Sequence, residues 1–255
     1  MQPSRQGTQT ATRSLGMLFV VAASPDPLAL RDIAATMGIA KSAAQRLLGE
    51  LVRQSLLMRT PDNRYGVGPS LVALAAQVLQ DDALRVAARP VLDALVERTS
   101  ETVSLYIRSV NQRVCIDSRE SPHPIRRAVP LGRTSPLFVG PTGKVILAYL
   151  PATEREAILA EAEAAGENVS LIRSQLGQIA ENGYMAAVGD RIPGVGGLSF
   201  ALLKDRVVIA AITVSGPADR WSVASMQAAL PGIVEDTQVL RSWSTSLKRP
   251  QRIAS

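Results

Sequence analysis

Two segments with helical periodicity, separated by only three residues, constrain the fold of this chain most strongly. Between residues 30 and 37, apolar side chains recur at the i, i+3, i+4, i+7 spacing of an amphipathic helix. The next periodic segment begins at Lys41, so Gly38-Ile39-Ala40 is the whole connection between them. A third periodic segment, residues 12–23, comes before them and ends at a proline-rich turn. Because such short connections hold helices tightly against one another, we predict a compact three-helix unit.

The third predicted helix, residues 41–55, has two chemically distinct faces. At about 100° per residue, one face is expected to pack in the core: Ala44, Leu47, Leu48, Leu51 and Ser55. The opposite face and its flanks carry Lys41, Ser42, Gln45, Arg46, Gly49 and Arg53. Such polar side chains contact phosphates and base edges in the major groove, and a glycine inside a helix favours close approach by a partner. An ordinary solvated face with an incidental glycine is the alternative.

A two-stranded hairpin is predicted directly after this helix. Residues 57–60 and 64–67 have strand character, and Pro61-Asp62-Asn63 between them is a turn sequence. Residues 12–69 therefore match a winged helix-turn-helix that binds double-stranded DNA, preceded by a flexible arm at residues 1–11. Arg59 and Arg64, near the tip of the wing, are candidates for contacts to the DNA backbone or minor groove. Plain solubilising charge is the alternative for both.

Charge and composition narrow the range of partners. Residues 1–80 carry eight Lys and Arg against four Asp and Glu, so this segment holds a net charge of +4 out of +6 for the whole chain. This fits a polyanionic partner, although an ordinary solvated surface fits equally well. One cysteine, Cys115, and one histidine, His123, argue against a disulfide or a zinc site, so we expect neither metal nor cofactor. The polar first twelve residues and the lack of a long apolar run predict a cytoplasmic protein without membrane contact.

The rest of the chain is predicted to be an α+β domain, residues 83–246, followed by a basic tail at residues 247–255. Helices are expected at residues 70–80 and 83–98, and Pro90 either kinks the second or lies near its start. From Glu101 the apolar period changes to two, which indicates an antiparallel strand. Further strands are expected at 184–188, 197–203 and 207–214, and further helices at 141–149, 153–165, 170–182 and 225–243.

No catalytic set is evident in this domain, so we do not expect an enzyme. Thr142-Gly143-Lys144 and the glycines after Pro193 lack the full spacing of a phosphate-binding or dinucleotide-binding loop. Cys115 lies in an apolar strand, where a buried, inert thiol is expected. His123 lies between two prolines with no acid or nucleophile motif beside it. The alternative is a small-molecule enzyme whose helical N-terminus serves only for dimerisation.

Short motifs follow one another in a consistent order along nearly the whole chain, at residues 30–34, 38–42, 46–48, 64–69, 88–92, 142–148, 182–184, 193–195 and 215–217. Together they resemble the IclR (isocitrate lyase regulator) family of transcription factors. The resemblance implies a GAF-like effector-binding domain with an antiparallel sheet. It also implies a linker helix at residues 70–82 that helps form a homodimer or a dimer of dimers, although a plain core helix is equally consistent with the sequence.

The resemblance also implies where an effector lies and what it is. Family effectors are typically small organic or aromatic acids, held between the sheet and the helix that contains Gly143 and Lys144. The matching positions here are Ser135, Pro141, Thr142, Gly197, Thr213 and Ser215. Each hydroxyl could instead satisfy its own backbone. The implied function is a ligand-responsive repressor or activator of a bacterial metabolic or catabolic operon, with operator DNA as its partner.

Overall fold

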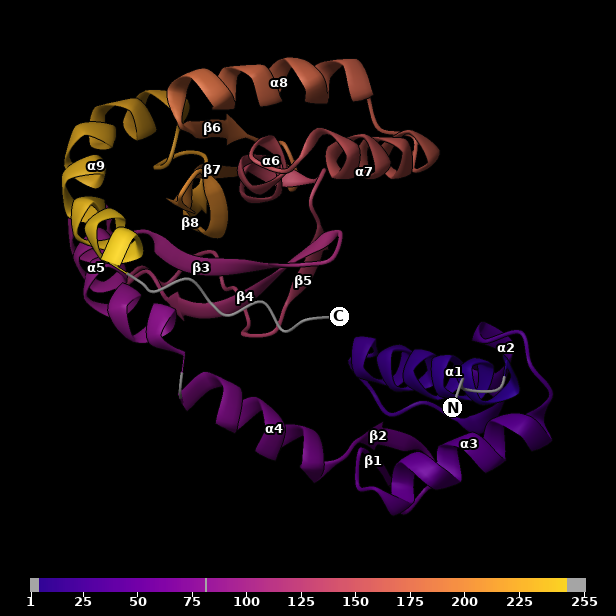
Figure 1. Cartoon of the computed structure of the whole chain (residues 1–255). Coiled ribbons are helices and arrows are strands. Elements are labelled where there is room, and N and C mark those ends of the chain that lie inside the picture. The colour runs from indigo at the N-terminus through magenta and orange to yellow at the C-terminus, as the bar shows by residue number, and fades with distance from the viewer. Residues whose placement is uncertain (1–4, 81, 247–255) are drawn as a thin grey trace. The chain divides into compact units, whose positions relative to one another are not determined.

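The computed structural model describes residues 5–80 and 82–246 and divides the chain into two compact units (Figure 1). The units comprise residues 1–82 and 83–255. In the described residues the first contains four helices and a small hairpin, and the second contains a six-stranded sheet with helices. The predicted α+β class is therefore confirmed. The predicted basic tail, residues 247–255, lies outside the described residues.

The first unit packs its first three helices and its hairpin around one small apolar core. Its elements are α1 (Arg5–Ala23), α2 (Leu30–Thr36), α3 (Lys41–Arg53), β1 (Leu57–Arg59) and β2 (Tyr65–Val67), followed by α4 (Pro69–Gln80). The core consists of Met17, Leu18, Val21, Ile33, Ala34, Ala44, Leu47, Leu48, Leu51, Leu57 and Tyr65. Gly38 has a φ of 61°, a left-handed conformation that glycine adopts without strain, and it reverses the chain between α2 and α3.

Two predicted boundaries in this unit were wrong. Helix α1 begins at Arg5, so the flexible arm expected at residues 1–11 is helical from Arg5 onward, and only residues 1–4 fall outside the description. No proline interrupts the segment from Arg5 to Thr12, so the helix extends back to Arg5 although this segment has no apolar face. Helix α3 ends at Arg53, and Ser55 is exposed with a φ of 55°. Ser55 therefore turns the chain toward β1 instead of packing in the core.

The predicted wing is present as an antiparallel hairpin. Leu57 pairs with Val67 and Arg59 with Tyr65, and Asn63 in the turn has a φ of 60°. Tyr65 also pairs with Leu28, because the two residues exchange backbone hydrogen bonds of 2.8 and 3.0 Å. The hairpin is thus fixed to the segment between α1 and α2 as well as to α3.

The sheet of the second unit is antiparallel throughout, in the order β5-β4-β3-β8-β7-β6. Its strands are β3 (Thr102–Ser109), β4 (Gln112–Arg119), β5 (Thr134–Pro136), β6 (Tyr184–Val188), β7 (Val195–Lys204) and β8 (Val207–Pro217). Strand β5 was not predicted from the sequence, because three residues are too few to display a period of two.

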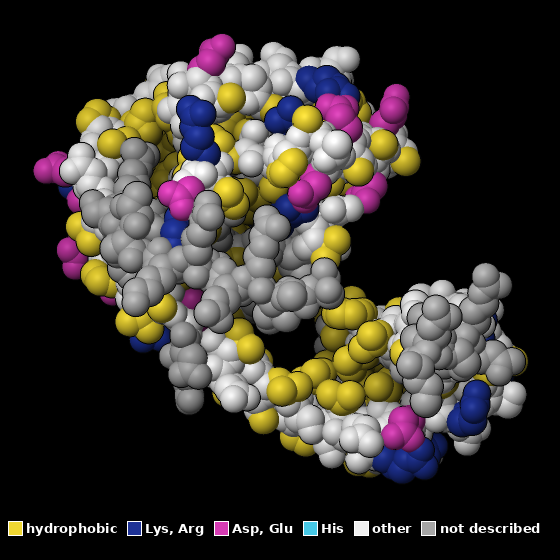
Figure 2. All heavy atoms as spheres, viewed as in Figure 1, with side chains coloured by type: hydrophobic (Ala, Val, Ile, Leu, Met, Phe, Trp, Pro, Cys, Tyr) yellow, Lys and Arg dark blue, Asp and Glu magenta, His cyan; other side chains and the backbone are white. Residues whose placement is uncertain are grey.

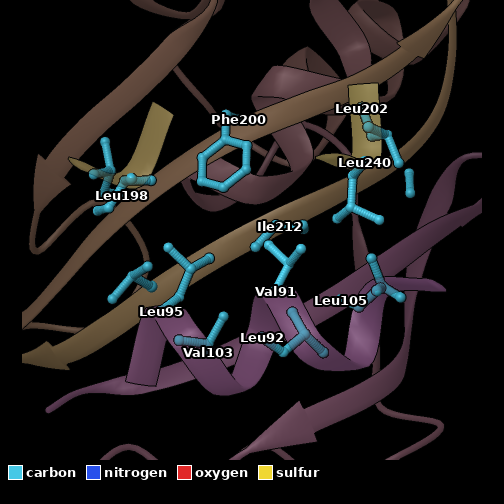
Figure 3. Close-up of a cluster of buried hydrophobic side chains, with 14 of the residues drawn as sticks. Val91, Leu92, Leu95, Val103, Leu105, Leu198, Phe200, Leu202, Ile212 and Leu240 are labelled. Atoms are coloured by element: carbon cyan, nitrogen blue, oxygen red, sulfur yellow. The ribbon is translucent and has the colours of Figure 1, made fainter. Parts of the chain in front are cut away.

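Helices cover both faces of this sheet (Figure 1). Helices α5 (Ala83–Thr99) and α9 (Val223–Ser246) pack on one face, whereas α6 (Gly140–Ala148), α7 (Ala152–Ala164) and α8 (Val169–Asn182) lie over the other. Figure 3 shows Val91, Leu92 and Leu95 of α5 within the first of these cores. Leu198 and Phe200 of β7 belong to the same core. Pro90 lies inside α5, not at its start.

Candidate functional site

The exposed face of α3 carries the residues that the sequence assigned to it. Lys41, Ser42, Gln45, Arg46, Gly49 and Arg53 are all exposed. On the other side of the helix, Ala44, Leu47, Leu48 and Leu51 are buried in the core of the first unit. Helical geometry alone thus separates a packed face from a polar face that is open to a partner.

The positive side chains on this face differ in their availability. Arg53 is ion-paired with Glu50, which also accepts a hydrogen bond of 3.2 Å from Gln54. Arg46 and Lys41, by contrast, form no hydrogen bond or ion pair with any residue the structure describes. Glu50 was not considered in the sequence analysis, although helical spacing places it one turn before Arg53. Arg46 and Lys41 are therefore the readily available cations on α3.

Gly49 lies in open space on the same face. A Cβ added there would meet no heavy atom within 4 Å. Nothing in the surrounding fold therefore requires a glycine, even though glycine weakens a helix interior by roughly 0.5–1 kcal/mol relative to alanine.

The two arginines of the wing already have contacts within the hairpin region. The Arg59 guanidinium lies over the Tyr65 ring, 5.9 Å from its centroid, a cation–π contact that leaves the side chain exposed. Arg64 forms an ion pair of 2.9 Å with Asp62 and donates a hydrogen bond of 3.3 Å to the Pro27 carbonyl. A DNA contact by Arg64 would have to compete with Asp62.

A second candidate site lies on one face of the large sheet, where polar side chains replace apolar ones. Alternate residues of β3, β7 and β8 point to this face, and their register brings them side by side. The set comprises Ser104, Tyr106, Gly197, Ser199, Thr213 and Ser215. The residues between them, such as Leu105, Leu198 and Ile212, belong to the apolar core with α5 and α9. The strands therefore direct alternate side chains to opposite faces of the sheet, as the sequence predicts, although both faces of the sheet are buried.

A pocket opens between this polar face and the first turn of α6. Five of the six predicted effector residues line it: Pro141, Thr142, Gly197, Thr213 and Ser215. Ser135 does not, because it lies in the edge strand β5 and donates its hydroxyl to the neighbouring Thr134 carbonyl at 2.6 Å. The space open to the centres of water molecules is about 50 Å³.

Three buried hydroxyls at the pocket bond to one another. Thr142 and Thr213 share a hydrogen bond of 2.8 Å, and Ser199 and Thr213 share another of 2.8 Å. Ser199 was missed in the sequence analysis, although it alternates with Gly197 along β7 and pairs with Thr213 of β8. These hydroxyls satisfy one another rather than their own backbone, whereas the Ser215 hydroxyl forms no hydrogen bond with any described residue.

Charged side chains surround the pocket. Arg113, Arg127 and Arg191 line it together with Asp190, whose two carboxylate oxygens accept hydrogen bonds from Lys144 at 2.6 and 2.8 Å. The sequence analysis identified none of these four residues as part of the site. Strand β4 and the loop between β6 and β7 bring Arg113 and Arg191 to this point from distant parts of the chain.

Neither Cys115 nor His123 belongs to a cluster with recognisable chemistry. The Cys115 thiol is buried, and burial raises its pKa to about 12, so it remains protonated and unreactive as predicted. Within residues 5–80 and 82–246, no group of three or more His, Cys, Asp or Glu side chains could hold a metal ion. No described helix is both long enough and apolar enough to cross a membrane.

Two family models match this chain in succession. Residues 10–61 match the IclR helix-turn-helix domain, and residues 76–239 match the bacterial transcriptional regulator IclR C-terminal domain. The "Probable transcriptional regulator SauR" of Cupriavidus necator is 24% identical over 90% of this chain and 94% of its own length.

Solved structures of the same family share the fold. An IclR family transcriptional regulator from Brucella abortus has a TM-score of 0.81 and 23% identity over 95% of both chains. An IclR homolog from Microbacterium hydrocarbonoxydans, complexed with 4-hydroxybenzoate, has a TM-score of 0.70 and 19% identity over 91% of this chain and 99% of that one. The named relatives are transcriptional regulators, which overturns the enzyme alternative. The two matched models cover most of the chain, which therefore belongs to the IclR family and is a ligand-responsive, DNA-binding transcriptional regulator.

Proposed function

We propose that this regulator binds a roughly palindromic operator as a homodimer or a dimer of dimers and controls a bacterial metabolic or catabolic operon. In this proposal the protein acts in the cytoplasm, and one α3 helix enters the major groove at each half-site. The observation that carries the proposal is the exposed face of α3, where Arg46 and Lys41 lack partners among the described residues and Gly49 leaves room for close approach.

An exposed apolar surface of the first unit supports the homodimer. Figure 2 shows hydrophobic side chains gathered over α4 and the adjoining part of this unit. Phe19 on α1 is 70% exposed, and Val72, Leu74 and Val78 on α4 are all more than half exposed. A contiguous apolar patch on a folded protein marks an interaction surface. Because symmetric dimers pair identical patches, a second copy of the chain is the proposed occupant.

The pocket of the second unit supports the sensing role. In the proposal it holds a small organic or aromatic acid, as the Microbacterium homolog holds 4-hydroxybenzoate. An effector changes operator binding only if its affinities for the DNA-competent and DNA-incompetent states of the dimer differ. Thr142, Thr213 and Ser215 supply hydroxyls, and Pro141 and Gly197 supply the apolar and open part of the wall.

Fluorescence anisotropy with labelled duplexes that tile the region upstream of the gene tests the proposal. At moderate salt, one duplex should bind much more tightly than the others, and the stoichiometry should be at least two chains per duplex. Equal affinity for every duplex would contradict operator binding. A thermal-shift screen of small organic acids, repeated with the bound duplex, should reveal a stabilising ligand without turnover.

Arg46→Ala should weaken operator binding by about 5- to 150-fold, the equivalent of roughly 1–3 kcal/mol for a guanidinium that contacts a base or phosphate. Loss of a phosphate contact should also reduce the slope of log affinity against log salt by about one. Arg173→Ala on α8 removes the same charge from an exposed position in the second unit, and it should change neither quantity. Unchanged affinity in Arg46→Ala would remove this residue from the interface.

Gly49→Ala should separate stability from DNA binding. Since an added methyl group meets no neighbour, hydrogen exchange at the α3 amides should report stabilisation by roughly 0.5–1 kcal/mol. The same methyl group should weaken operator binding, because the helix could no longer approach the groove as closely. Increased protection together with unchanged operator affinity would mean that Gly49 lies on an ordinary solvated face.

A further inference from the structure

Three arginine side chains line the effector pocket without a carboxylate partner. Arg113 comes from β4, Arg127 from the segment between β4 and β5, and Arg191 from the loop between β6 and β7. In the part of the chain that the structure describes, no ion pair joins any of the three to an aspartate or glutamate. Three like charges around one small space repel one another unless an anion lies between them.

The acidic residue of the lining does not balance them. Both oxygens of Asp190 are occupied by Lys144, whose ammonium group is 2.6 and 2.8 Å away. The Lys144 side chain is only 6% exposed and that of Asp190 only 12%, so this pair is sheltered from water and neutral as a unit. The charge left around the pocket is that of the arginines.

Arg113 is the most constrained of the three, with only 2% of its surface exposed. One terminal nitrogen donates to the carbonyls of Pro136 and Val139 at 2.8 and 2.6 Å. The fully buried Nε has no hydrogen-bond partner, and the other terminal nitrogen has none among the described residues. Unused donors on a buried cation are costly unless a ligand accepts from them. Burial lowers the pKa of Arg113 to about 10, so the guanidinium still carries its charge at neutral pH.

Arg191 converges with Arg113 on the first turn of α6. A Cβ added to Gly140 would lie 3.3 Å from the Cβ of Arg191 and 3.5 Å from the free terminal nitrogen of Arg113. Burial, followed by the positive charges of Arg133 and Arg127, lowers the pKa of Arg191. No side chain caps α6, so the N–H groups of its first turn add partial positive charge at the same point.

We infer that this pocket binds a compact organic dianion, carrying either two carboxylates or one phosphate monoester, in preference to a singly charged or neutral acid. The inference rests on the proposed sensing function and narrows its ligand. The space of about 50 Å³ is roughly three times what one water molecule needs, so the ligand is small. Guanidinium groups bind carboxylates and phosphates through paired hydrogen bonds, which suits Arg113 and Arg191.

Isothermal titration calorimetry of the full-length chain at pH 8 tests the inference. The dicarboxylates from oxalate to adipate are compared with monocarboxylates of equal carbon number, and ethyl phosphate, a dianion at pH 8 that lacks a carboxylate, represents the phosphate monoesters. At least one dianion should bind tenfold or more tightly than its singly charged counterpart. A preference for ethyl phosphate over every dicarboxylate would assign the dianion to a phosphate ester, and the reverse would assign it to a dicarboxylate.

Two arginine variants and one matched control complete the test. Arg191→Gln and Arg127→Gln should each weaken binding of the preferred probe by at least tenfold while the melting temperature stays unchanged. Arg126→Gln should leave binding unchanged, because Arg126 is ion-paired with Glu120 at 2.7 Å and does not line the pocket. Equal affinity for dianions and monoanions, or normal binding in both pocket variants, would overturn the inference. If a monoanion rather than a dianion changes operator binding, the sensing function stands and only the preference for a dianion is wrong. If the protein binds no operator at all, the proposed function itself is wrong.

Discussion

Gly143→Ala should destabilise the second unit by about 3 kcal/mol, one of the two largest effects expected from a single substitution in this chain. A Cβ at this position would lie 2.3 Å from the Leu137 carbonyl oxygen and 2.6 Å from a terminal nitrogen of Arg113. The carbonyl belongs to the backbone and cannot move independently, so α6 would have to shift away from it. Overpacking of this kind costs about 1–3 kcal/mol, and weakened hydrogen bonds from Arg113 to two carbonyls would add to that cost.

Urea unfolding followed by tryptophan fluorescence measures this effect selectively. The two tryptophans, Trp221 and Trp243, both belong to the second unit, so the signal does not report on the DNA-binding unit. Gly177→Ala in α8 is the matched control, since an added methyl group there meets nothing within 4 Å. The control should raise the free energy of unfolding by about 0.5–1 kcal/mol. An unchanged urea midpoint for Gly143→Ala would show that α6 can move away from Leu137 at little cost.

Asp117→Asn should lower the free energy of unfolding of the same unit by about 3 kcal/mol. The Asp117 side chain is only 3% exposed, and it holds Arg85 and Arg89 of α5 at 3.0 and 3.7 Å and Arg119 of β4 at 2.7 Å. Removal of one member of a buried ion-pair network leaves the remaining charges uncompensated, at a cost of about 3–5 kcal/mol. The lower end applies here, because Arg89 and Arg119 are partly exposed and water can solvate them.

Asp93→Asn provides the control for this network. Asp93 also binds Arg119, at 2.6 Å, but its side chain is 55% exposed. An exposed pair contributes less than about 1 kcal/mol, so the same urea experiment should detect little change. Equal effects of Asp117→Asn and Asp93→Asn would mean that burial adds nothing to the network and would contradict the prediction.

The exposed polar face of α3 was predictable because it depends on neighbours in the sequence. The angular position of Ala44 or Arg46 around α3 follows from a spacing of three and four residues, and the structure buries the former and exposes the latter. Ser55 was misassigned for a related reason. Its side chain falls on the apolar face only if the helix continues, and the helix has already ended at Arg53, with a left-handed backbone at Ser55.

The candidate effector pocket was only partly predictable, because it is assembled from strands and loops that lie far apart in the chain. Thr142 and Thr213 share a hydrogen bond across 71 positions, and nothing local to either residue specifies that contact. Family resemblance led to both of them, but it also led to Ser135, which lies in the edge strand β5 and does not line the pocket. Arg113 and Arg191 went unnoticed because an arginine in a strand or loop is usually solvated, whereas packing buries Arg113 and half-buries Arg191.

The sequence by itself determined the helix-turn-helix, the polar face of α3, the wing and the α+β class of the second unit, since helical and strand periods are local properties of the chain. The availability of those polar residues is also a local property, because Arg53 pairs with Glu50 three positions before it and Arg64 with Asp62 two positions before it. The tertiary structure alone brought Arg113, Arg127 and Arg191 to one pocket. The physical reason is that contacts between distant segments depend on how the helices pack on the sheet, and no local pattern in the sequence encodes that packing.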